Sequence, residues 1–128
     1  MNNCPFCNAA PSSLWLESAS AVALWDGYPI AEGHTLVVPR RHVTSLFDLP
    51  ASDLASVWEF VARVRAELAK RFRVESFTIG LNDGRPAGQT VMHAHIHVVP
   101  RREGDVPDPR GGIRWVIPKR ADYWTRSP

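Results

Sequence analysis

The segment HAHIHVV, residues 93–99, constrains this chain more than any other part of its sequence. It places three of the chain's five histidines at alternate positions, and the side chains of a β-strand point alternately to its two faces. As a strand, the segment presents His93, His95 and His97 on one face and the apolar residues between them on the other. The apolar face suits burial against a helix. The histidine face must line water or a ligand, because imidazoles are poor core material.

Two plainer interpretations of the three histidines compete with a catalytic one. The residues can sit by chance on a solvated strand, or they can form a metal-binding tract without a fixed geometry. A strand advances about 6.5 Å in two residues and about 13 Å in four. Neighbouring histidines can therefore reach the same small ion or phosphate, whereas the outer two cannot easily do so. We expect the three side chains to divide their tasks.

The rest of the sequence predicts an α+β domain with an antiparallel sheet in meander order. Apolar residues recur at spacings of three and four through 51–72, which indicates one long amphipathic helix. A length of 128 residues suits a single domain, 1–128, whose tail from 103 to 128 is irregular. Further strands are expected at 14–17, 20–26, 33–39 and 76–83, with a short extended piece at 113–118.

Composition and charge argue against several classes of function. The formal net charge of +2 is too small to indicate a nucleic-acid-binding protein. No apolar stretch is long enough to cross a bilayer, and the N-terminus lacks the pattern of a secretion signal. The two cysteines, Cys4 and Cys7, would close too small a loop for a useful disulfide, so we predict a cytoplasmic protein with reduced thiols.

The motif CPFC, in the N-terminal segment 1–10, pairs Cys4 with Cys7. Such a pair is half of a zinc site, a redox pair or a coincidence. The redox interpretation is weak, because a redox pair begins a helix after a strand and this pair precedes the first predicted strand. A tetrahedral zinc needs two more ligands, commonly histidines, and the residues alone do not choose among five candidates. The candidates are His34, His42, His93, His95 and His97.

A glycine-containing loop, residues 82–90, comes just before the histidine segment. Glycines let backbone N–H groups converge on an anion, and Asn82, Gln89 and Thr90 add polar side chains. Most loops of this kind are only connections. The position of this loop directly ahead of the histidines nonetheless favours contact with a phosphate.

Together these motifs resemble the histidine triad (HIT) superfamily, whose signature of three histidines alternating with apolar residues reads here as HAHIHVV. The block NDGRPAGQTVMHAHIHVVPRR, 82–102, resembles the core block of the family, and GHTLVVPRRH, 33–42, resembles its second block. The likeness covers roughly residues 4–102. It implies a HIT-like fold that forms a two-fold homodimer, with one nucleotide site in each protomer.

The resemblance also implies a hydrolase. The transferase branch of the family carries glutamine at the third histidine position, so His97 points to the hydrolase branches. Of these, the core block looks more like the dinucleoside polyphosphate hydrolases than the nucleoside phosphoramidases. The expected substrate is a purine dinucleoside polyphosphate such as Ap4A or a related nucleotidyl conjugate. The tail 103–128 resembles that of a bacterial subset of the family, and we expect it to shape the leaving-group side of the pocket.

Matching the family motif residue by residue implies roles for the polar side chains. His95 matches a nucleophile that attacks the α-phosphorus and forms a nucleotidyl-histidine intermediate, from which water releases a nucleoside monophosphate. The expected catalytic residues are His34, Gln89, His95 and His97. The expected nucleotide-binding residues are Asp26 at the ribose, Leu36 with Leu24 at the base, Asn82 at sugar or phosphate, Gln89 and Thr90 at the phosphates, and His95 and His97.

The resemblance also implies how the cysteines are used. Family members with an N-terminal CxxC hold zinc with that pair, the histidine that ends the second block and the first histidine of the triad. Four filled positions would make such a zinc structural. The implied ligands here are Cys4, Cys7, His42 and His93.

Two rival hypotheses remain for the same residues. In the first, two triad histidines hold a catalytic zinc that activates water, and metal removal stops turnover without unfolding the chain. In the second, the protein is a nucleotide-binding module without catalysis, which binds purine nucleotides tightly and turns none of them over.

Overall fold

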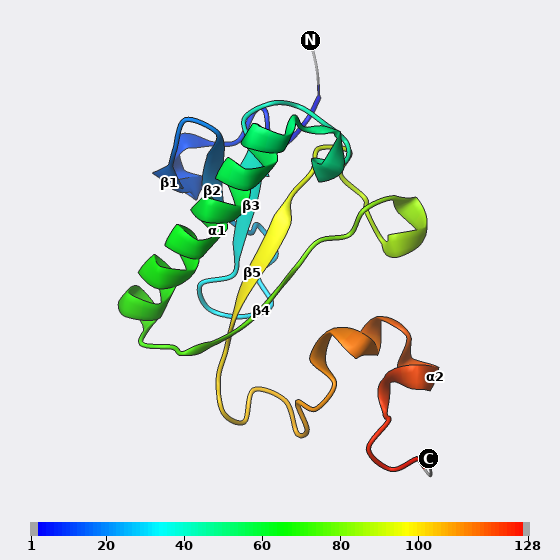
Figure 1. Cartoon of the computed structure of the whole chain (residues 1–128). Helices are drawn as coiled ribbons and strands as arrows, with labels where there is room; N and C mark the ends of the chain where they lie inside the picture. Colours follow the sequence, from blue (N-terminus) through cyan, green and yellow to red (C-terminus); the bar gives the residue numbers. More distant parts are fainter. Residues whose placement is uncertain (1–2, 127–128) are drawn as a thin grey trace.

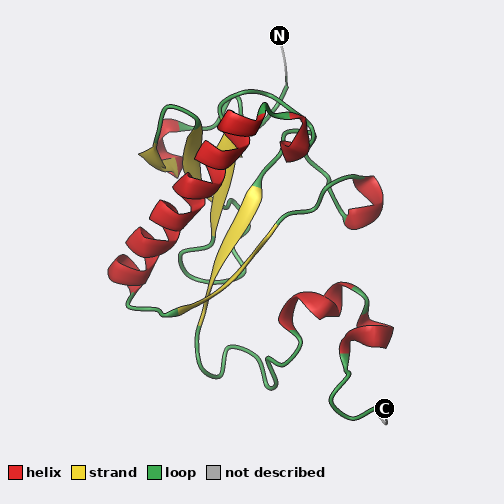
Figure 2. Cartoon of the chain, viewed as in Figure 1, coloured by secondary structure: helices red, strands yellow, loops and turns green. Residues whose placement is uncertain are grey.

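Within residues 3–126, five short strands form one sheet and one long helix lies across it (Figures 1 and 2). The computed structural model describes these residues, and the two residues at each end of the predicted domain 1–128 lie outside them. The strands are β1 (Leu14–Glu17), β2 (Ala21–Trp25), β3 (Thr35–Pro39), β4 (Ser76–Gly80) and β5 (Ile96–Arg101). The helices are α1 (Ala51–Phe72) and α2 (Pro118–Ala121), with 3₁₀ turns at Pro11–Ser13, Leu46–Asp48, Arg85–Ala87 and Gly112–Val116.

The bounds of α1 agree with the prediction from periodicity. Its apolar stripe is buried along the helix, from Val57 through Val64 to Leu68. The helix ends at Phe72, and the left-handed conformation of Arg73 (φ of 56°) turns the chain so that the backbone N–H of Val74 donates to the carbonyl of Ala69 at 3.2 Å. None of the helices in residues 3–126 combines the length and apolar character that a membrane span requires.

The predicted antiparallel sheet with one long helix is confirmed, and its strand order is β1-β2-β3-β5-β4. The first three strands follow one another as a meander. The last two also pair with each other, but β5 lies between β3 and β4. This departure from simple succession arises because α1 carries the chain from β3 to the far edge, so the returning strand fills the gap. β5 therefore occupies an inner position, and β4 forms an edge.

The two faces of the sheet have different roles. On one face, α1 packs against alternate strand residues such as Val37, Ile96 and Val98 to form the main core. On the other face, Leu36 and Val38 pack against the N-terminal segment. The residues of β4 and β5 that point to this second face border an open cleft rather than a helix.

Two local predictions need correction. The histidine segment was expected to be a strand over 93–99, but β5 begins at Ile96. The preceding backbone turns toward another loop, because the N–H of Ala94 donates to the carbonyl of Val43 at 2.7 Å. The piece at 113–118 is not extended: it consists of a 3₁₀ turn and the start of α2. The guanidinium of Arg114 donates to the carbonyls of Arg120 and Ala121, which closes this segment on itself.

Candidate active site and metal site

His95, the second histidine of the triad, has its ring orientation fixed by the backbone. Its Nδ1 lies 2.9 Å from the carbonyl oxygen of His93, and a carbonyl only accepts, so the proton of the neutral ring sits on Nδ1. The lone pair is therefore on Nε2. The ring is 8% exposed and lines the cleft. A neutral imidazole held in this tautomer is equipped to act as a nucleophile.

His97, the third histidine, belongs to a hydrogen-bonded chain that sets its tautomer too. The backbone N–H of Ile30 donates to Nδ1 of His34 at 3.2 Å, so the neutral ring of His34 carries its proton on Nε2. That Nε2 donates to Nδ1 of His97 at 2.9 Å and lies 3.3 Å from a carboxylate oxygen of Asp26. His97 is left with its own proton on Nε2, where it can donate to an oxygen in the cleft.

Burial holds these two rings in the neutral state. It lowers the pKa of His34 below the usual value for histidine, and the carboxylate of Asp26 offsets part of this effect. Burial also lowers the pKa of His97, as do His95 and His34, while Asp26 again acts in the opposite direction. Neutral rings are what the hydrogen-bonded chain from Ile30 requires.

The lowered pKa values predict a loss of stability in mild acid. The unfolded chain takes up protons on His34 and His97 near the reference value of about 6.5, whereas the folded chain does so only at lower pH. The free energy of unfolding should therefore fall as the pH drops from 7.5 to 5. It should fall less in His97→Asn, which retains a carbonyl to accept from His34. Urea unfolding at each pH, with zinc in excess, measures how the free energy of unfolding changes with pH in the wild type and in His97→Asn. Equal slopes for the two proteins would contradict the neutral state assigned to His34 and His97.

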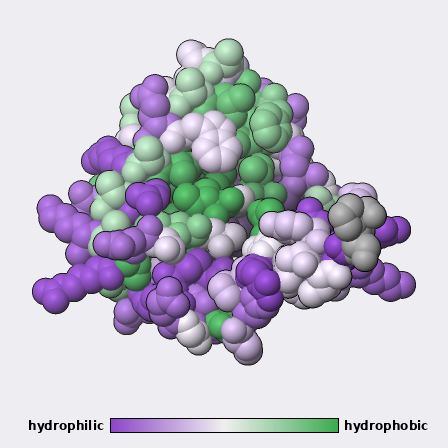
Figure 3. Space-filling model, turned by 60° about the horizontal axis from the view of Figure 1, so that its bottom comes forward, coloured by the Kyte–Doolittle hydropathy of each residue, from purple (hydrophilic) through white to green (hydrophobic). Residues whose placement is uncertain are grey.

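The cleft on the open face of the sheet has a volume of about 1110 Å³. The face that carries the C-terminal tail shows hydrophobic residues gathered toward its middle, with hydrophilic side chains around them (Figure 3). The predicted site residues that line the cleft are Asp26, His34, Leu36, Asn82, Thr90, His95 and His97. Apart from Gln89 and Leu24, the cleft thus brings together every predicted catalytic and nucleotide-binding residue.

Gln89 differs from its predicted role in direct phosphate contact. Its side chain is 4% exposed, and both ends of its carboxamide are bonded to backbone. The oxygen accepts from the N–H of Gly84, and the amide donates to the carbonyls of Thr44 and Val91 at 2.9 and 3.0 Å. Gln89 therefore stabilises the conformation of the loop 82–90 through bonds to backbone groups rather than facing the cleft. Leu24, expected near the base, packs in the cluster under the N-terminal segment and is not part of the cleft lining.

The cleft also contains side chains that the sequence analysis did not assign. Phe6 packs edge-on against the ring of His95, with 4.9 Å between their centres. Its position between the two cysteines offered a signal, because cysteines that meet His93 bring the residues between them close to the histidine segment. Tyr28, Ile30 and the apolar tail residues around Ile113 also line the cleft. No motif marks these residues.

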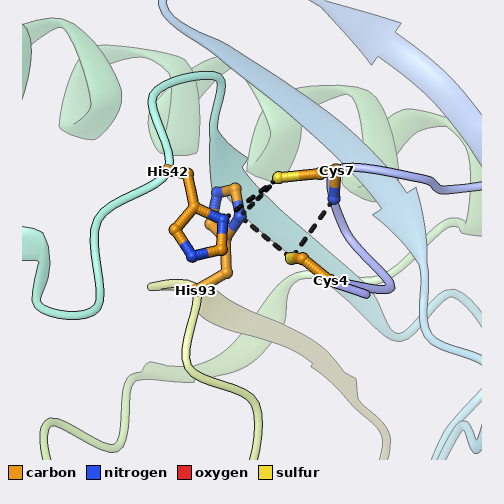
Figure 4. Close-up of side chains that lie close together, drawn as sticks. All are labelled: Cys4, Cys7, His42 and His93. Atoms are coloured by element: carbon orange, nitrogen blue, oxygen red, sulfur yellow. Dashed lines mark hydrogen bonds between the residues drawn. The ribbon is translucent and has the colours of Figure 1, made fainter. Parts of the chain in front are cut away.

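The four predicted metal ligands converge from three separate segments of the chain (Figure 4). Cys4 and Cys7 come from the N-terminal turn, His42 follows β3 and His93 precedes β5. Sγ of Cys4 lies 3.3 Å from Nδ1 of His93, and Sγ of Cys7 lies 3.1 Å from Nδ1 of His42. The four candidate ligand atoms lie within 4.8 Å of one another.

The donor set and its surroundings fit zinc. Two thiols and two imidazoles are a common tetrahedral set for this metal. Nε2 of His93 donates to the carbonyl of Pro39 at 2.8 Å, which leaves the lone pair on the nitrogen that faces the cysteines. Burial lowers the pKa of His93, which favours the neutral form that binds a metal. These residues can therefore hold a metal ion.

A second group of metal-capable side chains, Asp26, His34 and His97, lies in the cleft. The tautomer of His34 argues against a metal there. Its Nδ1 accepts from the N–H of Ile30 and so carries no proton, and a metal on Nε2 would then require a doubly deprotonated ring. Within residues 3–126, neither such group contains two of the three triad histidines, as the catalytic-zinc hypothesis requires.

Comparison with known proteins agrees with this geometry. The family profile described as "HIT domain" matches residues 8–104. Over 80 residues the chain is 46% identical to the nitrilase and fragile histidine triad fusion protein NitFhit of Caenorhabditis elegans, covering 62% of this chain and 18% of that protein. Over 94 residues it is 43% identical to the asymmetrical bis(5'-nucleosyl)-tetraphosphatase of Schizosaccharomyces pombe, covering 73% of this chain and 52% of that enzyme.

A solved structure is similar along most of its length as well. The zinc-bound histidine triad family protein of Mycobacterium smegmatis superposes with a TM-score of 0.69 at 36% identity, covering 83% of this chain and 84% of the other. The profile match spans most of the sequence. The chain therefore belongs to the HIT domain family.

Proposed function

We propose that the protein hydrolyses the nucleotidyl bond of dinucleoside polyphosphates, with His95 as the nucleophile. One observation carries this proposal: the carbonyl of His93 fixes the proton of His95 on Nδ1 and leaves the lone pair on Nε2, in a ring that lines the cleft. The similarity to a bis(5'-nucleosyl)-tetraphosphatase supports the substrate class.

The proposed reaction has two displacements at the same phosphorus. Nε2 of His95 attacks the α-phosphorus, a phosphorus–nitrogen bond forms, and the bond from phosphorus to the bridging oxygen breaks. The remaining nucleotide leaves with the electron pair of that bond. Water then attacks the phosphorus, the phosphorus–nitrogen bond breaks, and a nucleoside monophosphate is released. Two easier steps replace one difficult step.

The neighbouring side chains stabilise this chemistry in the proposal. Nε2–H of His97 donates to an oxygen of the α-phosphate, where negative charge accumulates, and such an aimed donor contributes roughly 3 to 4 kcal/mol. Asp26 binds the ribose hydroxyls while also supporting His34. Asn82 and Thr90 contact sugar or phosphate from the loop that Gln89 holds in shape. Gln89 is thus a positioning residue.

We also propose that the metal is zinc and that its role is structural. When bound by Cys4, Cys7, His42 and His93, zinc would link the N-terminal segment to the sheet. The presence of a zinc-bound relative supports this proposal. The cytoplasmic location stays a prediction.

We also propose that the protein forms a homodimer. β4 lies at the edge of the sheet, so one side of its backbone has no neighbouring strand within residues 3–126. An open edge can pair with another strand. A second copy of the chain, joined through this edge, would satisfy the exposed backbone groups.

A turnover panel tests the function. In water enriched in oxygen-18, we expect the protein to release labelled AMP from diadenosine tetraphosphate faster than from an AMP–amine conjugate, because water attacks the phosphorus of the AMP moiety. Faster turnover of the conjugate would instead identify a phosphoramidase. Tight nucleotide binding without turnover of either compound would identify a binding module.

A further inference from the structure

The C-terminal tail contributes part of the cleft although it lies beyond the family profile. The profile ends at residue 104, yet Ile113, Val116 and Ile117 line the same cleft as the histidines. We refer to these three residues as the tail surface. The tail surface therefore adds to the cleft a part that the matched family profile does not cover.

The strand order places the tail surface on the far side of the histidines from the ribose-binding carboxylate. Leu36, His97 and Gly80 pair as one row across β3, β5 and β4. Adjacent strands lie about 4.8 Å apart, so the row runs roughly 10 Å across the sheet. At one end of this row, Asp26 directly follows the last residue of β2, the strand next to β3. At the other end Ile113 lies against Gly80, where a Cβ would come within 3.2 Å of the Cδ1 of Ile113.

Folding alone does not explain the tail surface. Ile113, Val116 and Ile117 are 60%, 71% and 59% exposed. Other contacts hold the tail in shape: the indole N–H of Trp115 donates to the carbonyl of Arg110, and the guanidinium of Arg114 closes the segment. Large apolar side chains that stay exposed inside a ligand cleft indicate a contact with ligand.

The cleft therefore has apolar surfaces at both ends and polar groups between them. Tyr28, Ile30 and Leu36 lie at the end near Asp26, and the tail surface lies at the other. The volume of about 1110 Å³ is above the range of roughly 300–1,000 Å³ that is usual for one small ligand. This arrangement matches a molecule with a flat apolar group at each end and phosphates in the middle.

We infer that the tail surface binds the nucleobase of the leaving nucleotide, so that the tail selects dinucleoside over mononucleoside polyphosphates. The inference rests on the proposed function for the identity of the substrate. It assigns the two nucleosides to opposite ends of the cleft, with the bond to be broken beside His95 and His97.

Binding measurements test the inference without requiring turnover. The probes are diadenosine tetraphosphate with methylene groups in place of its bridging oxygens, and a counterpart with the same phosphates and one adenosine. The variant is the triple replacement Ile113→Ser, Val116→Ser and Ile117→Ser. Calorimetry should show about tenfold weaker binding of the dinucleoside probe, because apolar contact area is lost. Binding of the counterpart should stay within twofold.

The controls separate the possible failures. Val106→Ser removes an exposed apolar side chain that is outside the lining of the cleft, and it should change neither affinity. If the triple variant does not fold, Val116→Ser alone should weaken binding of the dinucleoside probe two- to fivefold. Equal loss for both probes, or loss for neither, overturns the inference. A further outcome is that the triple variant loses affinity only for the dinucleoside probe while the wild-type protein hydrolyses no dinucleoside polyphosphate. That result would overturn the proposed function and leave the assignment of the tail surface unchanged.

Discussion

His95→Asn is expected to lower the release of AMP from diadenosine tetraphosphate by about 10⁴-fold or more, since the loss of a covalent nucleophile removes the pathway itself. The asparagine amide can still donate to the carbonyl of His93, so the local fold should persist. Affinity for AMP should change little, because most of the expected ribose, base and phosphate contacts come from other residues. Steady-state rates and calorimetric titration with AMP measure the two effects.

The intermediate gives a second, independent readout of the same prediction. Wild-type protein stopped in alkali during turnover, where phosphorus–nitrogen bonds survive, should carry one AMP on the peptide that contains His95. The variant should carry none. Phe47→Asn, which changes an exposed side chain outside the cleft, serves as the control and should keep full activity. Full activity of His95→Asn, or an adduct on another residue, would refute the nucleophile assignment.

Zinc removal is expected to produce the second large effect, a loss of about 4 kcal/mol in the free energy of unfolding when the free metal had been 1,000-fold above its dissociation constant. The cause is that the unfolded chain cannot present all four ligands at once, so binding energy contributes to folding. Chemical denaturation before and after chelation, with the metal content measured on the same sample, checks the value.

The double replacement Cys4→Ser, Cys7→Ser is the control for this experiment, because it removes two of the four metal ligands. The variant should start at the lower stability, and the chelator should then have no further effect on it. A catalytic zinc predicts a different pattern. If chelation stopped turnover while stability stayed unchanged, the metal would be the reacting centre and the structural role would be wrong.

Local periodicity predicted the helix well, because α1 has an uninterrupted stripe of buried residues from Val57 to Leu68. The family resemblance, rather than the spacing of residues, selected His42 and His93 among five histidines as partners of the cysteines. The structure brings those four side chains together. No local pattern could have selected them, since the cluster joins segments that are about 40 and 50 residues apart in the chain.

Other features depend on long-range contacts that a single sequence does not display. Alternation of polar and apolar residues placed His93 in a strand, but the bond from Ala94 to Val43 draws this backbone out of the sheet. Gln89 looked like a phosphate ligand because its two backbone acceptors, from Thr44 and Val91, are invisible before folding. The strand-like composition near Ile113 was outweighed by the bonds that Arg114 makes within the tail.

His93 makes two different contacts: its imidazole faces the cysteines, and its main-chain carbonyl oxygen accepts a hydrogen bond from Nδ1 of His95. One residue therefore contributes both to the contact with the N-terminal segment and to the orientation of His95, the proposed nucleophile. Phe6, which lies between the two cysteines in the sequence, packs against the ring of His95. Loss of a metal from this site would therefore disturb both the N-terminal segment and the two contacts that orient the ring of His95.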